Sequence, residues 1–193
     1  MSDDLSRRDV FGLAARSAAL AGLSGVGAFL AVKAHGSDAW HIDTSKCVNS
    51  RLGAVGVEVC QRCATECVLP LSAVRAVTVF ADCGRCYICP AYFDIHSAIG
   101  PDGLPSKKLC PRDAIDRQPI GWIDPDDLAN NYYDYTIDES LCNGCGLCVM
   151  GCKEPAGLGS ITLEVRHDTC VACNRCSIST ACPDEAYELR PTA

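Results

Sequence analysis

The stretch that decides the fold of this chain is Cys142-Asn143-Gly144-Cys145-Gly146-Leu147-Cys148-Val149-Met150-Gly151-Cys152. Its first three cysteines are two residues apart, and the fourth follows after three more residues. Three thiolates at this spacing wrap a short loop around one iron–sulfur cube, whereas the fourth lies beyond the loop and reaches a second cube. The stretch therefore predicts part of a pair of iron–sulfur sites.

A second set of cysteines supplies the other part of this pair. Cys170, Cys173 and Cys176 repeat the two-residue spacing, and Cys182 follows after five more residues and is itself followed by a proline. Seventeen residues separate Cys152 from Cys170, which leaves room for a helical turn, a bend and a strand. We therefore predict two 4Fe–4S clusters in this part of the chain.

The first half of the chain repeats this plan with insertions. Residues 42–47 match residues 137–142 at an offset of 95, and the next three cysteines match at an offset of 85. The loop 48–59 has twelve residues where the later copy has two, and twenty residues separate Cys89 from Cys110. Four groups of four cysteines result, which predicts four 4Fe–4S clusters. The groups are Cys47, Cys60, Cys63 and Cys67; Cys83, Cys86, Cys89 and Cys110; Cys142, Cys145, Cys148 and Cys152; and Cys170, Cys173, Cys176 and Cys182.

Composition narrows the classes of protein further. Sixteen of the 193 residues are cysteine and only 6% are aromatic. Side-chain packing alone would therefore give only a small hydrophobic core. Structural zinc joins two Cys-x2-Cys pairs and does not need triplets, and cysteines two apart on a tight loop rarely form good disulfides. We disfavour both alternatives. The formal charge of −7 offers no basic surface for phosphate, so we expect no nucleic-acid partner.

The N-terminal segment has the pattern of an export signal. Arg7 and Arg8 precede Val10 and Phe11, and an Ala/Gly/Leu-rich run continues to Val32. A twin arginine before such a run indicates Tat export, so we predict a Tat signal over residues 1–34, cleaved or retained as a membrane anchor. A route that exports proteins with their cofactors loaded would keep sixteen thiols from forming disulfides in an oxidising compartment.

Two short β-rich stretches and one linker complete the pattern. Residues 74–80 and 161–165 are rich in Val, Ile and Thr, which predicts strands. Residues 116–131 contain two prolines and many polar residues, which predicts a connector. Tyr132, Tyr133 and Tyr135 are expected to pack in the core or linker, with a partner contact as the alternative.

In its cysteine groups the chain resembles the bacterial-type polyferredoxins. With the twin arginine, four clusters and one stretched loop, it is similar to the MauM/NapG-type ferredoxins. The resemblance implies an α+β fold of two tandem ferredoxin-like two-cluster units, with small strands and short helices, after an N-terminal signal helix. The units would span residues 40–118 and 119–193.

The resemblance also implies how the ligands cross. Each triplet would take its fourth ligand from the same half of the chain, with Cys110 joining the first group, Cys67 the second, Cys182 the third and Cys152 the fourth. A nested arrangement, with the first group paired to the fourth, is the alternative. The short gaps within each half favour the tandem arrangement.

From this resemblance we expect an electron carrier without an active site of its own. It would relay single electrons between a periplasmic or membrane oxidoreductase and a quinol- or cytochrome-linked partner, in the periplasm or on the outer face of the cytoplasmic membrane. Sixteen cysteines for four cubes leave no open iron site for catalysis. The alternative is an assembly or maturation factor that donates clusters to a redox enzyme.

Overall fold

The computed structural model describes residues 38–51, 58–153 and 157–191. The predicted Tat signal, residues 1–34, lies outside the described residues. No helix within the described ranges combines the length and the apolar character needed to cross a bilayer.

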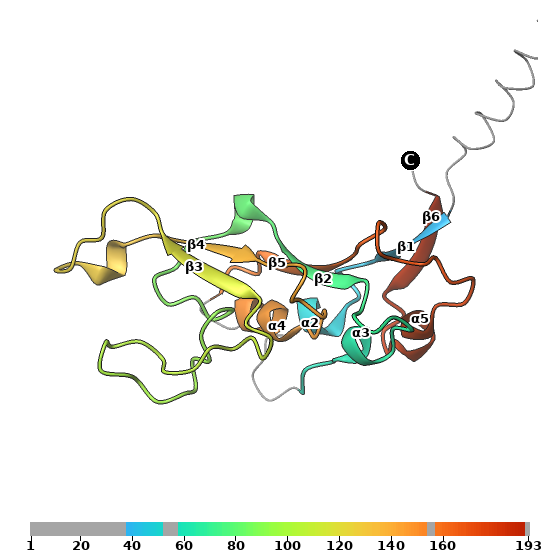
Figure 1. Cartoon of the computed structure of the whole chain (residues 1–193), viewed down its shortest axis with the longest axis horizontal. Helices are drawn as coiled ribbons and strands as arrows, with labels where there is room; N and C mark the ends of the chain where they lie inside the picture. Colours follow the sequence, from blue (N-terminus) through green and yellow to red (C-terminus); the bar gives the residue numbers. More distant parts are fainter. Residues whose placement is uncertain (1–37, 52–57, 154–156, 192–193) are drawn as a thin grey trace, which may run out of the picture. The chain divides into compact units, whose positions relative to one another are not determined.

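Ala39–Arg190 form one compact unit built of short strands and short helices (Figure 1). Each strand has five residues, and the longest α-helix has seven. In chain order the elements are β1 (Asp38–Ile42), α2 (Val48–Arg51), α3 (Arg62–Thr65), β2 (Val74–Thr78), η1 (Phe80–Asp82), β3 (Ile115–Pro119), η2 (Leu128–Asn130), β4 (Tyr133–Ile137), α4 (Leu147–Lys153), β5 (Ile161–Val165), α5 (Ser177–Ala181) and β6 (Tyr187–Pro191).

The described strands pair in a nested order. β1 pairs with β6, β2 with β5 and β3 with β4, so the outermost strands of the sequence meet and so do the innermost. The β2–β5 pair is antiparallel, with Val74 opposite Val165 and Thr78 opposite Ile161. The boundary expected between residues 118 and 119 lies within β3, which pairs with β4 in an antiparallel hairpin.

The predicted strands are confirmed, but the predicted connector is wrong in part. Residues 161–165 form β5, and residues 74–78 of the stretch 74–80 form β2. Residues 115–119, however, form β3 although most of them are polar. Ile115 anchors this strand because it is only 3% exposed, and β4 supplies the backbone partners.

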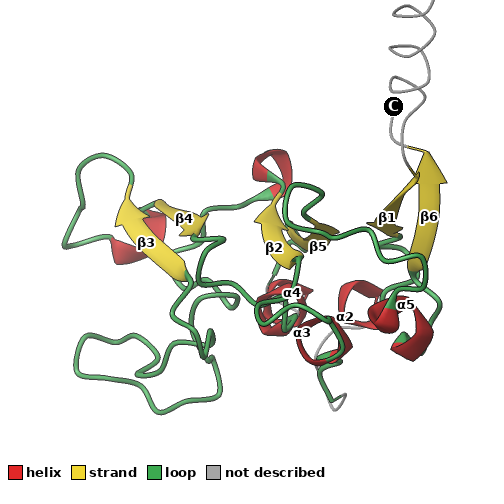
Figure 2. Cartoon of the chain, turned by 45° about the vertical axis from the view of Figure 1, so that its right-hand side comes forward, coloured by secondary structure: helices red, strands yellow, loops and turns green. Residues whose placement is uncertain are grey.

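The core lies between the central strands and α4. Val74 on β2 and Leu163 on β5 are both 1% exposed, and Val149 on α4 is fully buried. Helices α2–α5 lie on the same side of the strand pairs in both views (Figures 1 and 2). Tyr133 and Tyr135 are buried in this core, as predicted, whereas Tyr132 is 58% exposed.

Candidate iron–sulfur sites

The sixteen cysteines gather into four sets, each with three members of one group and one member of another. All sixteen are free thiols. We number the sets as site 1 (Cys47, Cys60, Cys63 and Cys182), site 2 (Cys67, Cys170, Cys173 and Cys176), site 3 (Cys110, Cys142, Cys145 and Cys148) and site 4 (Cys83, Cys86, Cys89 and Cys152).

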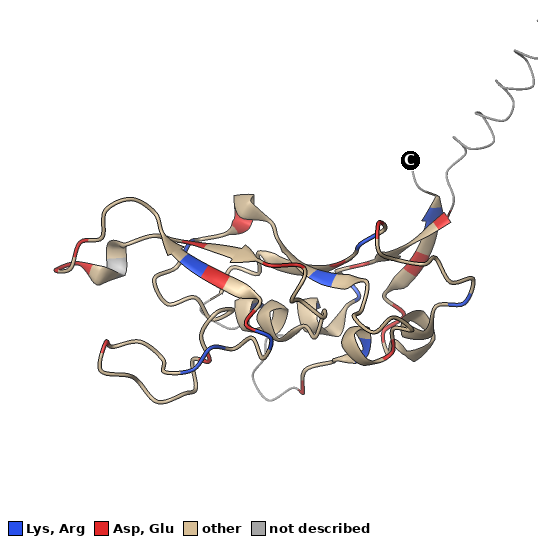
Figure 3. Cartoon of the chain, in the orientation of Figure 1, with Lys and Arg blue, Asp and Glu red and all other residues tan. Residues whose placement is uncertain are grey.

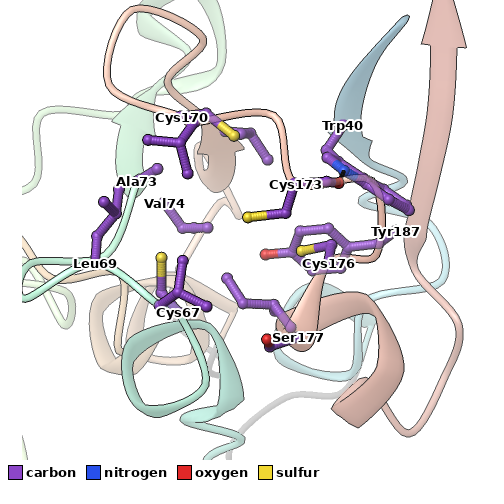
Figure 4. A pocket seen from close by; sticks show the side chains of 14 residues that line it. Trp40, Cys67, Leu69, Ala73, Val74, Cys170, Cys173, Cys176, Ser177 and Tyr187 are labelled. Atoms are coloured by element: carbon purple, nitrogen blue, oxygen red, sulfur yellow. Dashed lines mark hydrogen bonds between the residues drawn. The ribbon is translucent and has the colours of Figure 1, made fainter.

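At three of these sites the cysteines line a small space. All four cysteines of the set line this space at sites 1, 2 and 3. Figure 4 shows the sulfur atoms of Cys67, Cys170 and Cys173 pointing into the space at site 2. At site 4, burial raises the pKa of the Cys86 and Cys89 thiols, and Cys152 lies near enough to both to raise it further by charge repulsion.

The expected tandem pairing of cysteines is wrong. The fourth ligand was expected from the same half of the chain, yet Cys182 lies with the first group and Cys110 with the third. Cys67 likewise lies with the fourth group and Cys152 with the second. The structure therefore has the nested arrangement.

Two backbone hydrogen bonds give the physical reason for this nesting. The N–H of Asp43 donates to the carbonyl of Ala186 at 2.7 Å, and the N–H of Asp138 donates to the carbonyl of Ala114 at 2.8 Å. At sites 1 and 3 they dock the segment before the first cysteine of the triplet against the segment after the single cysteine that comes from the other group. Strand pairing brings these segments together, so a short gap along the chain does not decide the pairing.

Sites 1 and 3 are built by the same local structure. The Asp43 carboxylate accepts hydrogen bonds from the N–H and hydroxyl of Ser45 at 3.0 and 2.6 Å, and Asp138 accepts the same two from Ser140 at 2.9 and 2.6 Å. These bonds lower the pKa of both carboxyl groups. Such Asx-turns fix the direction of the chain just ahead of the first cysteine of each triplet, Cys47 at site 1 and Cys142 at site 3.

Backbone amides also point at sulfur in the same way in both sites. The N–H of Ala186 donates to Cys182 Sγ and that of Ala114 to Cys110 Sγ, each at 3.4 Å. The residue before each alanine has a positive φ, 48° and 52°, which turns the amide toward the sulfur. Hydrogen bonds of this kind to ligand sulfur raise the reduction potential of an iron–sulfur cluster.

The thiols themselves are hard to ionise in the absence of a cation. Burial raises the pKa of Cys63 to about 12 and that of Cys89 to about 11, and it also raises the pKa of Cys148. A buried thiolate next to other thiolates needs a positive charge to stabilise it. Metal ions are the usual source of that charge, because the thiolate is the ligating form.

Several sites are neighbours, because they share lining residues or lie along the same strand or helix. Tyr187 and Ile178 line both site 1 and site 2. Val74 lines site 2, and Ala76, two residues further along β2, lines site 3. Helix α4 carries cysteines of both site 3 and site 4. Sites 1 and 2, sites 2 and 3, and sites 3 and 4 are therefore neighbours.

An arginine held by aromatic rings stands beside site 4. The Arg117 guanidinium carbon lies 3.5 Å from the ring centre of Tyr133, and its Nη2 donates to the carbonyl of Tyr87 at 3.0 Å. Its Nε donates to the Tyr135 hydroxyl at 3.2 Å, and that hydroxyl donates to the carbonyl of Cys86 at 2.7 Å. A cation is thereby tied to the loop that carries the site 4 cysteines.

The arrangement suits a metal–sulfur group better than a single ion. Four thiols per site, amides aimed at sulfur and raised thiol pKa values match the donor set that 4Fe–4S clusters use. Among the described residues, no three His, Cys, Asp or Glu side chains converge as the ligands of one metal ion would. At sites 1, 2 and 3 the four cysteines instead line one common space.

Comparison with known proteins agrees with this chemistry. Residues 135–156, which include the third cysteine group, match the family model described as 4Fe-4S binding domain. The chain is 31% identical over 116 residues to the pyruvate-flavodoxin oxidoreductase of Rhodospirillum rubrum, an alignment that covers 57% of this chain. The chain spans only 9% of the length of that relative. No solved structure matches.

These findings support a ferredoxin-type protein with 4Fe–4S binding and a general role in iron–sulfur electron transfer. The sequence analysis did not identify two residues at the sites, Tyr187 at site 1 and Arg117 at site 4. For Tyr187 a signal existed, because the repeat aligns residues 110–114 with residues 182–186 and the next position is Ile115 in one copy and Tyr187 in the other. For Arg117 the sequence carries no comparable signal.

Proposed function

We propose that the chain holds four 4Fe–4S clusters, one at each of sites 1–4, and relays single electrons between redox partners. The observation that carries this proposal is the convergence of all sixteen thiols in four sets of four. Each cluster, when bound, supplies one one-electron redox couple. The adjacency of the sites, with lining residues shared between sites 1 and 2, supports a relay over separate storage sites.

The chain's own residues would do three things for such clusters. The thiolates bind iron, and the amides of Ala114 and Ala186 donate hydrogen bonds to ligand sulfur. Buried apolar residues such as Val74 and Ile178 exclude water from the sites. A dry, hydrogen-bonded site protects the cluster and tunes its potential.

The proposed partners are basic redox proteins. Without residues 1–34, which carry four basic and three acidic residues, the formal charge is −8. Loaded clusters with their thiolates would add about −2 each. The tip of the β3–β4 hairpin adds local acidity through Asp124, Asp126 and Asp127 (Figure 3). An acidic carrier docks to a basic patch through complementary charge.

The cellular location and the partners are proposed from the N-terminal sequence. A twin-arginine signal favours the periplasm or the outer face of the cytoplasmic membrane. A membrane or periplasmic oxidoreductase on one side and a quinol- or cytochrome-linked protein on the other would then exchange electrons through this chain.

Iron and acid-labile sulfide counts on anaerobically purified full-length protein test the cluster number. We expect about sixteen of each per chain, from four irons and four sulfides per cluster. Reversible reduction and reoxidation in a dithionite titration, with the clusters retained, would support a relay. Clusters that leave readily to an apo-acceptor and do not cycle would instead indicate an assembly factor, and a count near eight would remove two of the sites.

A further inference from the structure

Sites 1 and 3 allow a comparison within one molecule. Both have an Asx-turn before the first cysteine of the triplet and an amide–sulfur hydrogen bond of 3.4 Å at the single cysteine that comes from the other group. The aligned segments 110–114 and 182–186 end in Ala114 and Ala186, and the next residue begins β3 or β6. At this next position the two sites differ, because Ile115 stands at site 3 and Tyr187 at site 1.

The hydroxyl of Tyr187 meets a ligand sulfur directly. Its oxygen lies 3.1 Å from Cys63 Sγ, and the residue is only 8% exposed. Ile115, which is 3% exposed, fills the corresponding place at site 3 and has no hydrogen-bond donor on its side chain. The same fold therefore gives one site a side-chain donor to sulfur and denies it to the other.

The tyrosine must be the donor once iron is bound. A metal-bound thiolate carries no proton, so the hydrogen of this bond can come only from the phenol. A phenol with the ordinary tyrosine pKa of about 10 keeps its proton at neutral pH. A hydrogen bond to an anionic acceptor in a dry site is stronger than one between neutral groups.

We propose that Tyr187 is a positioning residue that raises the reduction potential of the cluster at site 1 through its hydrogen bond to Cys63. The inference rests on the proposed function, because it assumes a 4Fe–4S cluster at this site. Reduction adds negative charge to the cluster and its thiolates, and a donor to sulfur stabilises that charge more in the reduced state. Site 1 would then favour holding the electron.

The test is a redox titration of Tyr187→Phe in the full chain, followed by electron paramagnetic resonance. We expect the midpoint potential of one cluster to move to a more negative value while the other three stay in place. The moving signal is assigned to site 1 by its loss in Cys182→Ala. The control is Tyr135→Phe, which removes a buried hydroxyl that donates to the carbonyl of Cys86 and not to sulfur, and it should leave the site 1 signal unmoved.

A second variant covers the case in which Tyr187→Phe does not load its clusters. Site-specific replacement of Tyr187 by a fluorinated tyrosine keeps the ring and makes the phenol a stronger donor, so the site 1 potential should move to a more positive value. An unchanged site 1 potential in either loaded variant overturns the inference. An unmodified protein with fewer than four clusters would instead count against the proposed function, so the two failures are distinguishable.

Discussion

At the scale of single residues, turns beside the cysteines hold backbone conformations that side chains disfavour. Four described residues other than glycine have positive φ values between 47° and 52°, and each lies within three residues of a cysteine. In an L-residue this region costs roughly 1–2 kcal/mol. This unfavourable backbone conformation recurs at matching positions of different cysteine groups. The recurrence indicates that the turns beside the cysteines require it. The four are Arg85, Asp113, Ala172 and Glu185.

Ala172 allows a direct test of this cost. It is exposed and has a φ of 47°, whereas the corresponding position of the third group is Gly144, with a φ of 72°. Ala172→Gly should stabilise the loaded protein by up to ~1 kcal/mol, because glycine adopts this conformation without strain. The measurement is the denaturant midpoint for loss of the visible cluster absorbance.

The control for Ala172→Gly is the same change in a helix. Ala64 lies in α3, where glycine costs about 1 kcal/mol relative to alanine. Ala64→Gly should therefore lower the midpoint while Ala172→Gly raises it. Equal effects of the two changes would mean that the turn at Ala172 carries no strain.

At the scale of elements, one buried side chain closes the stretched loop of the first group. Asn49, on α2, is 2% exposed. Its Nδ2 donates to the carbonyl of Cys60 at 2.7 Å, and its Oδ1 accepts from the N–H of Cys60 at 3.0 Å. This clamp joins the two ends of the twelve-residue loop, so Cys60 reaches the position that the shorter loop gives to Cys145.

Removal of the clamp should loosen site 1 in particular. Asn49→Ala loses two hydrogen bonds and leaves the backbone of Cys60 without these partners, which costs roughly 2 kcal/mol. We expect the site 1 signal to be lost first in denaturant, as followed by electron paramagnetic resonance. Asn130→Ala, which removes an exposed hydrogen bond to Asp127, should leave the order of loss unchanged. Simultaneous loss of all four signals in Asn49→Ala would contradict this account.

At the scale of the whole molecule, nesting ties the two halves of the chain together. Every described strand pairs with a strand far from it in sequence or across the predicted boundary. Each site also draws its fourth cysteine from the other half. Neither half can therefore complete its clusters by itself.

Paired cysteine substitutions distinguish the nested from the tandem arrangement. The double variant Cys63→Ala/Cys182→Ala removes ligands from one site if the sites are nested and from two sites if they are tandem. Because the sites are nested, we expect about twelve irons per chain and not about eight. The reciprocal variant, Cys63→Ala with Cys110→Ala, should keep about eight irons. Iron analysis of the two anaerobically purified variants makes the measurement, and the opposite pair of counts would support tandem units.

The amino-acid sequence by itself determined that the chain has four groups of cysteines at iron–sulfur spacing, because spacing along a tight loop fixes which three thiols can meet. It also predicted β2 and β5 from their β-branched residues. Only the tertiary structure decided which fourth thiol joins each triplet. That cysteine lies beyond its own loop, so its neighbours depend on which strands pair, and strand pairing is set by burial and backbone hydrogen bonds between distant segments. The same holds for Tyr187, since a phenol becomes a donor to sulfur only when the strand that carries it packs over another group's cysteine.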